Sequence, residues 1–186
     1  MKQRSRGKGI LYLGPVYSSK TNRVISTFND NVDENNPGIV FKRDMDNRYG
    51  GTEQVISHNK LSVKACIVKD ASEILEKSKN YSIVAIDELQ FFEGIDIIIE
   101  KLISEKKFII GSGLNCDYRR KPFDTISKCI PHMKVKYCHG KCKNCGRKSQ
   151  YSGRVINGKL IKDGDLIIKS DKDSYVPLCS ACWYIL

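Results

Sequence analysis

Apolar runs of strand length alternate with segments of helical periodicity over the first two thirds of the chain. The runs that read as buried strands are residues 10–13, 39–41, 63–68, 81–86 and 108–110. The clearest helical stripe between them consists of Ile95, Ile98, Ile99, Leu102 and Ile103. Nearly all-apolar strands that alternate with helices predict a parallel sheet with helices on both faces. Ligands of such sheets bind at the carboxyl ends of the strands, and polar residues follow these runs here.

Two more helices are expected from local signals. Helical spacing relates Val24, Ile25, Phe28 and Val32, before Asn35-Asn-Pro-Gly38 breaks the pattern. Asp70-Ala-Ser-Glu73 resembles a capping box and predicts the start of the next helix.

The segment Gly14-Pro-Val-Tyr-Ser-Ser-Lys-Thr21 follows the first apolar run and opens the first helical segment. This is the context of a phosphate-binding loop, in which backbone N–H groups and a lysine cradle the phosphates of a nucleotide. Lys20 would reach the β- and γ-phosphates, and the Thr21 hydroxyl would ligate Mg²⁺. The consensus has glycine immediately before the lysine, where this chain has Ser19. The motif is therefore recognisable but imperfect.

A pair of acids follows the fourth apolar run. Ile83-Val-Ala-Ile86 leads into Asp87-Glu88, the pattern that holds the magnesium shell in nucleoside triphosphatases. Adjacent carboxylates near a phosphate can divide the work, one on the metal and one accepting a hydroxyl proton. A solvated acidic turn is the alternative for a lone pair of acids. Together with Lys20 and Thr21, and in this order, the acids favour a nucleotide site.

From about Tyr137 the sequence changes character. Asn157-Gly158, between two short apolar runs, predicts a β-hairpin, and Asp163-Gly164 offers a second turn before the run at 166–168. The same segment carries two CxxC pairs, Cys142 with Cys145 and Cys179 with Cys182. Four thiolates around a hairpin predict a closed, structural zinc site, with unrelated pairs or a redox dithiol as the alternative. We therefore divide the chain into an α/β domain, 1–136, and a zinc-binding domain, 137–186.

Composition limits the possible partners. The chain has 186 residues, eight cysteines and a formal net charge of +11, which favours polyanions or nucleotide phosphates without establishing nucleic-acid binding. The apolar runs are too short for a bilayer span. The basic N-terminus is followed by too short an apolar stretch for a secretion signal, so a cytoplasmic protein without disulfides is expected. The four scattered cysteines, Cys66, Cys116, Cys129 and Cys138, are expected to be buried small apolar residues.

Seven motifs in the chain point to one family. They are Gly14-Pro-x-x-Ser-x-Lys-Thr21, Lys42-x3-Asp46-x-Arg48-Tyr49, Ser57-His58, Ile86-Asp-Glu-Leu-Gln-Phe-Phe92, Gly113-Leu-x2-Asp117-Tyr-Arg-Arg-Lys-Pro-Phe123, Cys142-x2-Cys-Gly146 and Asp173-Ser-Tyr-Val-Pro-Leu-Cys179-x2-Cys182. In this order, and over nearly the whole chain, they resemble the motifs of type II thymidine kinases. That family comprises the cytosolic vertebrate, bacterial and large-DNA-virus enzymes.

The resemblance implies a fold and an activity. The fold is a P-loop NTPase-like parallel sheet flanked by helices, with a small C-terminal β-rich zinc-binding domain that carries a lasso loop. The activity is ATP- and Mg²⁺-dependent phosphorylation of the 5′-hydroxyl of thymidine or deoxyuridine, in pyrimidine nucleoside salvage. The resemblance also implies a homotetramer with feedback inhibition by dTTP. Membrane partners are not expected, and nucleic acid is not favoured.

Site residues are carried over from the family position by position. Glu88 would be the general base, and Arg48 would stand near the transferring phosphate. The residues implied in binding ATP and its metal are Gly14, Pro15, Ser18, Ser19, Lys20, Thr21, Asp46, Asp87 and Gln90. The residues implied in binding the nucleoside are Phe91, Leu114, Tyr118, Phe123, Tyr151, Ile168 and Tyr175. Tyr118 would lie beside the base, and Tyr175 with the 166–174 stretch would belong to the lasso.

The departures from the family pattern are mostly lost glycines. Ser19 replaces the loop glycine, Asn115-Cys116 replaces an Asp-Gly, and both Asp124 and Lys169-Ser170 stand where glycine is usual. Glycine at such places permits positive φ, and its loss could cost about 1 kcal/mol per site. The alternative function is thus a nucleotide-binding, kinase-like protein with weak or lost catalysis. A basic zinc-ribbon nucleic-acid binder is a third hypothesis, which leaves Lys20-Thr21 and Asp87-Glu88 unexplained.

Overall fold

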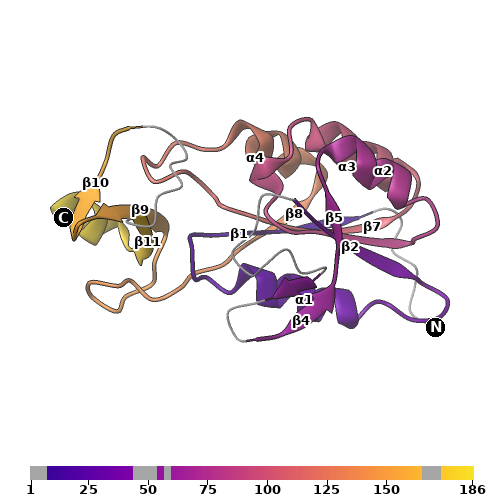
Figure 1. The fold of residues 1–186 in the computed structure, drawn as a ribbon, viewed down its shortest axis with the longest axis horizontal. Coiled ribbons are helices and arrows are strands. Elements are labelled where there is room, and N and C mark those ends of the chain that lie inside the picture. Colours follow the sequence, from indigo (N-terminus) through magenta and orange to yellow (C-terminus); the bar gives the residue numbers. More distant parts are fainter. Residues whose placement is uncertain (1–7, 44–53, 57–59, 165–172) are drawn as a thin grey trace.

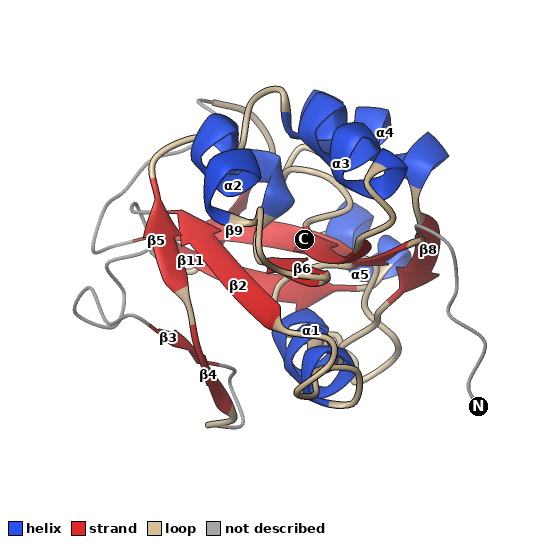
Figure 2. Cartoon of the chain, turned by 90° about the vertical axis from the view of Figure 1, so that its right-hand side faces the viewer, coloured by secondary structure: helices blue, strands red, loops and turns tan. Residues whose placement is uncertain are grey.

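A computed structural model describes residues 8–43, 54–56, 60–164 and 173–186. Its main feature is a six-stranded sheet in the order β5-β2-β6-β7-β1-β8, with every neighbouring pair parallel (Figures 1 and 2). The strands are β1 Gly9–Leu13, β2 Gly38–Arg43, β5 Cys66–Val68, β6 Ile83–Ile86, β7 Phe108–Gly113 and β8 Lys134–Tyr137. The predicted parallel sheet is confirmed.

Helices cover both faces of this sheet. They are α1 Lys20–Asn29, α2 Ala71–Lys77, α3 Ile95–Ser104 and α4 Asp124–Cys129, with 3-10 turns η2 Leu89–Phe91 and η3 Ile130–His132. Helix α1 lies on one face, and α2, α3 and α4 lie on the other (Figure 1). Along β6, Val84 and Ile86 pack toward α2–α4 whereas Ile83 and Ala85 pack toward α1. Both faces of the strand are therefore buried, which explains its continuous apolar sequence.

Two details of the predicted pattern differ from the structure. The run 63–68 is not one strand: it divides at Ala65 into β4 Ser62–Lys64 and β5 Cys66–Val68. Strand β4 pairs antiparallel with β3 Gln54–Ile56, while β5 joins the main sheet beside β2. Helix α1 ends at Asn29, so Val32 lies beyond it, although its side chain still packs against the same core cluster.

A smaller sheet follows the large one. Strands β9 Tyr151–Ile156, β10 Lys159–Ile161 and β11 Asp173–Leu178 form an antiparallel sheet in the order β10-β9-β11, and helix α5 Ser180–Ile185 follows it. This module lies beyond one end of the main sheet (Figure 1). Asn157 and Gly158 have φ values of 50° and 78°, as a type I′ hairpin turn requires. The predicted hairpin is confirmed, while the run 166–168 lies outside the described residues.

The division at residue 136 stays a prediction, and β8 extends to Tyr137. Among the described residues, none of the helices combines the length and apolarity that crossing a bilayer requires.

Candidate active site

The loop between β1 and α1 is held close to its neighbours. The Gly14 N–H donates to the Gly113 carbonyl at 3.3 Å, which ties the loop to the end of β7. A side chain on Gly14 would place its Cβ 2.3 Å from the Cys138 carbonyl oxygen, so only glycine fits there. The buried Ser18 hydroxyl and Lys20 amine both donate to the Pro15 carbonyl, at 2.7 and 2.8 Å. The lysine therefore lies inside the loop, where a phosphate-binding lysine is expected.

Ser19 adopts the left-handed backbone conformation that glycine tolerates best. It has φ 60° and ψ 26°, immediately before α1, and its side chain makes no capping hydrogen bond to the helix. The expectation that the missing glycine leaves a strained residue is confirmed at this position. Asn115, Cys116 and Asp124 have no positive φ, so the strain expected at those three is absent. Lys169 and Ser170 lie outside the described residues.

The two acids meet the loop at the carboxyl end of β6. The Thr21 hydroxyl lies 3.4 Å from one Asp87 carboxylate oxygen. The other oxygen accepts a short hydrogen bond from the hydroxyl of Ser112, which is fully buried in β7. Ser112 in turn accepts the Glu88 N–H at 3.3 Å. The Thr21 hydroxyl, the Asp87 carboxylate and the Ser112 hydroxyl thus form one cluster of oxygen atoms, the type of donor that Mg²⁺ prefers, and Glu88 is tied to it by its backbone N–H.

Glu88 is itself on a turn of left-handed conformation, with φ 57° and ψ 54°. Its carboxylate accepts a short hydrogen bond from the Gln90 amide nitrogen. The Gln90 amide oxygen accepts the Leu114 N–H at 3.1 Å. Gln90, predicted to bind ATP or its metal, is buried, and both ends of its amide contact protein groups.

The predicted nucleoside-binding residues come from both parts of the molecule. Tyr118, buried in the segment after β7, lies with its ring 5.3 Å from the guanidinium carbon of Arg154 on β9. Tyr175 on β11 is the register partner of Arg154. The structure therefore brings Tyr118 and Tyr175 to the same buried arginine. Phe91, Leu114 and Phe123 are half-buried around the ends of β6 and β7; Asp46, Arg48 and Ile168 lie outside the described residues.

The segment after β7 is also fastened to the small module. The Trp183 indole N–H donates to the Tyr118 carbonyl at 3.2 Å. The Arg120 guanidinium carbon lies 4.4 Å from the centre of the Tyr151 ring, and also faces Trp183 and Tyr184 at 5.1 and 4.7 Å.

Three residues of this region, Ser112, Arg154 and Trp183, are not among those that the sequence predicts. The side-chain contacts described for them join residues 24 or more positions apart, and the local sequence carries no signal for them.

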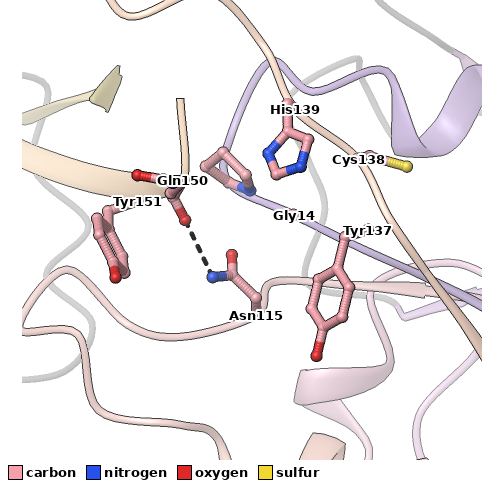
Figure 3. A pocket seen from close by; sticks show the side chains of 8 residues that line it. Gly14, Asn115, Tyr137, Cys138, His139, Gln150 and Tyr151 are labelled. Atoms are coloured by element: carbon pink, nitrogen blue, oxygen red, sulfur yellow. Dashed lines mark hydrogen bonds between the residues drawn. The ribbon is translucent and has the colours of Figure 1, made fainter. Parts of the chain in front are cut away.

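A small cavity of about 140 Å³ lies where the loop between β1 and α1 meets the small module (Figure 3). Its lining includes Gly14 and Pro15 from the loop, Gln150 just before β9 and Tyr151 at the start of that strand. Across it, the Asn115 amide nitrogen donates to the Gln150 carbonyl at 3.0 Å. Residues of the loop and of the small module thus line the same cavity.

The four paired cysteines come together as predicted. The sulfur atoms of Cys142, Cys145, Cys179 and Cys182 all lie within 4.8 Å of one another. Four thiolates around one zinc ion, each at its usual bond length, would be about 3.8 Å apart, so the cluster fits such an ion. Donors also face the sulfurs: Asn144 donates to Cys182 at 3.2 Å, and Arg147 to Cys145 at 3.3 Å. The Arg147 hydrogen bond lowers the pKa of the Cys145 thiol to about 6.

The remaining cysteines have a different character. Cys116, Cys129 and Cys138 are buried as expected, whereas Cys66 is half-buried. Burial raises the pKa of the Cys116 thiol to about 11 and that of Cys129 to about 12. Such thiols stay protonated at neutral pH and act as apolar side chains.

Comparison with known proteins identifies the family. The family model described as thymidine kinase matches residues 7–183. The chain belongs to the thymidine kinase family. A thymidine kinase of Amsacta moorei entomopoxvirus is 32% identical over 181 residues, which cover 93% of this chain and 96% of the viral protein. A thymidine kinase of Porphyromonas gingivalis is 29% identical over 180 residues, covering 96% and 85% of the two chains.

Two solved structures show only a distant likeness. The ATPase DotB of Legionella pneumophila has a TM-score of 0.46 and 5% identity, covering 77% of this chain and 44% of that one. The flagellar accessory protein FlaH of Methanocaldococcus jannaschii has a TM-score of 0.43 and 9% identity, covering 83% and 75%. Assignment to the thymidine kinases, a family of phosphotransferases, rests on the sequence matches.

Proposed function

We propose that this chain transfers the γ-phosphate of ATP to the 5′-hydroxyl of thymidine or deoxyuridine, giving the nucleoside monophosphate. The observation that carries the proposal is the cluster in which Thr21 meets Asp87 and Glu88 follows directly. It joins a phosphate-binding loop to a carboxylate suited to accept a proton. Membership of the thymidine kinase family supports thymidine as the acceptor.

The loop residues would bind and orient ATP. Gly14, Pro15, Ser18 and Ser19 form the backbone around the phosphates, and the Lys20 amine would turn from the Pro15 carbonyl to the phosphate oxygens. Thr21 and Asp87 present oxygen ligands to Mg²⁺. That ion, when bound with ATP, would neutralise charge on the phosphates.

Glu88 would act as the general base. As the 5′-oxygen attacks the γ-phosphorus, its proton passes to the Glu88 carboxylate and the bond from phosphorus to the ADP oxygen breaks. Arg48 and Asp46 would stand beside the transferring phosphate. Because phosphoryl transfer depends mostly on positioning and charge neutralisation, these few groups suffice chemically.

The small module would complete the nucleoside site. Tyr118 and Tyr175, with Phe91, Leu114, Phe123, Tyr151 and Ile168, would enclose the thymidine. The four thiolates would hold a structural zinc ion, since they leave no open position for a reacting ligand.

The family resemblance further supports a cytoplasmic homotetramer that dTTP inhibits and that acts in nucleoside salvage. Sedimentation tests the tetramer, and titration with dTTP tests the inhibition.

The test is formation of dTMP from thymidine, ATP and Mg²⁺ by the purified zinc-containing protein. Glu88→Gln should lower kcat by about 10²- to 10⁴-fold, because the amide cannot accept the proton. Glu93→Gln is the matched control, since Glu93 is exposed and lies five residues further on. Its kcat should equal that of the wild type. Equal activity of Glu88→Gln and wild type would refute the role of Glu88, and no dTMP from the wild type would refute the kinase.

A second candidate is a protein that binds thymidine and nucleotide without turning them over. The left-handed conformation of Ser19 favours it, because a side chain stands where the loop would approach phosphate closely. It predicts dTTP binding by calorimetry with no dTMP formation. Gain of turnover in Ser19→Gly would then locate the defect in the loop.

A further inference from the structure

Gln90 is a buried polar residue that the proposed reaction does not use. It lies in η2, two residues after Glu88, and only 7% of it is exposed. Burying an amide is unfavourable unless its hydrogen bonds are formed inside the protein. The partners of this amide therefore indicate its role.

The two ends of the amide face two different groups of the site. The nitrogen donates to the Glu88 carboxylate, and the oxygen accepts the Leu114 N–H at 3.1 Å. A carboxylate can only accept and an N–H can only donate, so these partners fix the orientation of the amide. Gln90 thus bridges the proposed base and the first residue of the segment that leads to Tyr118.

The surrounding backbone keeps this bridge in place. A Cβ on Gly113 would lie 3.1 Å from the Gln90 amide oxygen and 2.5 Å from the Ile126 side chain, so glycine leaves room for the amide. The Gln90 carbonyl accepts the Thr125 hydroxyl at 3.3 Å, from the first turn of α4. Strand β7 thus leaves room for the Gln90 amide, while α4 contacts only the backbone of this residue.

Glu88 needs such support because its turn is unusual. Its backbone is left-handed, and the Ser112 hydroxyl holds its N–H. This fixes the backbone but leaves the carboxylate free to rotate about its own side-chain bonds. Of the described groups, the Gln90 amide is the side chain that hydrogen-bonds to that carboxylate.

We infer that Gln90 is a positioning residue, whose amide aims the Glu88 carboxylate at the nucleoside hydroxyl and couples it to the backbone at Leu114. This replaces the expectation that Gln90 binds ATP or its metal. The inference rests on the proposed role of Glu88 as base. It assigns Gln90 an effect on the chemical step, exerted through Glu88 and not through contact with substrate.

Two substitutions at Gln90 distinguish the effects of its hydrogen bonds to Glu88 and to Leu114. Gln90→Met removes both at nearly constant size. Gln90→Glu retains an acceptor for the Leu114 N–H but replaces the donor to Glu88 by a second carboxylate. Both should lower kcat by about 10- to 100-fold, the scale of a misplaced catalytic group, with the KM for ATP within about twofold of wild type. The KM for thymidine should rise in Gln90→Met only, because only that variant releases Leu114.

Thr125→Val is the control, since it removes a hydrogen bond to the Gln90 backbone and leaves the amide untouched. Its kcat should match that of the wild type. Near-UV circular dichroism and zinc content establish that each variant is folded. If Gln90→Met does not fold, Gln90→Glu provides the test.

A double mutant distinguishes positioning from general stabilisation. If Gln90 acts through Glu88, then adding Gln90→Met to Glu88→Gln should lower kcat by less than about twofold further, because coupled residues are not additive. A second 10-fold loss in the double mutant, or wild-type kcat in both Gln90 variants, would overturn the inference. Wild-type protein that forms no dTMP would instead refute the proposed function, and the two failures are thereby distinguishable.

Discussion

The main sheet and the small cysteine module differ in what holds them together. The two clusters that line the sheet contain 17 and 11 buried residues, most of them aliphatic or aromatic. The cluster in the small module contains five, and three of these are cysteines. So small an apolar core cannot offset the entropy of ordering the segment, whereas metal ligation can. The proposed nucleoside site draws on both parts, so its order should depend on the less stable one.

Removal of the metal should therefore have the largest effect: the small module should lose its structure while the main sheet keeps it. In Cys179→Ser the cluster loses one thiolate ligand, and apparent zinc affinities of about 10–16 kcal/mol show how much stability is involved. We expect loss of bound zinc, rapid proteolysis within residues 137–186 and loss of thymidine binding. The far-UV signal of helices α1–α4 should remain.

Cys66→Ser is the control for this change, because Cys66 lies in β5, away from the cluster. It should keep one zinc per chain. Stoichiometric zinc in Cys179→Ser, or unfolding of the whole chain, would contradict the difference drawn between sheet and module.

The opposite perturbation is a cavity in the core of the sheet. Ile99 on α3 is fully buried, and Ile99→Ala should lower the free energy of unfolding by about 2–5 kcal/mol in urea titration. Ile97 on the same helix is 65% exposed, so Ile97→Ala should change that free energy by less than about 0.5 kcal/mol. Zinc content should be unchanged in both. Comparable losses at the two positions would show that α3 does not pack as described.

A smaller effect is expected where the two parts touch. Trp183→Phe keeps a ring beside Arg120 but removes the indole donor to the Tyr118 carbonyl. Loss of one such hydrogen bond is worth about 1 kcal/mol, so the KM for thymidine should rise about fivefold while the KM for ATP stays constant. Ile185→Ala, at a position of the same helix that is 79% exposed, should change neither. Equal shifts in both KM values would mean that the contact does not act on the nucleoside segment.

Sequence predicted the parts of the fold that depend on local periodicity. Strands β1, β2, β6 and β7 are apolar because they are buried on both faces, and this pattern needs no tertiary information. Strand β8, at the edge, was missed because two lysines alternate in its four residues. The division at Ala65 was missed for another reason: the two halves of 63–68 pair with different strands, and pairing partners are not encoded locally.

The same contrast between local patterns and contacts of distant segments applies to the candidate site. The candidate phosphate-binding loop, the acid pair and the four cysteines can be recognised in the sequence because each is a short motif with fixed spacing. Ser112 could not be assigned, because its hydroxyl meets Asp87 only when β6 and β7 are adjacent. The burial of Gln90 depends on contacts with residues such as Leu114, 24 positions away, so its neighbours in the sequence do not reveal it, and its assignment to ATP or the metal stays a prediction.

The smallest expected effect is that of a substitution at Ser19. It should change the stability of the part built on the main sheet and leave the small module unchanged. Ser19→Gly relieves a left-handed serine, a strain of about 1 kcal/mol, but glycine also makes the unfolded chain more flexible. We expect a net gain of up to about 1 kcal/mol in the free energy of unfolding, and tighter ATP binding. Ser26→Gly is the matched control, because Ser26 is exposed inside α1. There the same substitution should lower stability by about 0.5 kcal/mol, since glycine is the poorer helix former. Urea titration of the two variants decides the matter: a loss of stability at both positions would mean that the loop backbone does not favour glycine at Ser19.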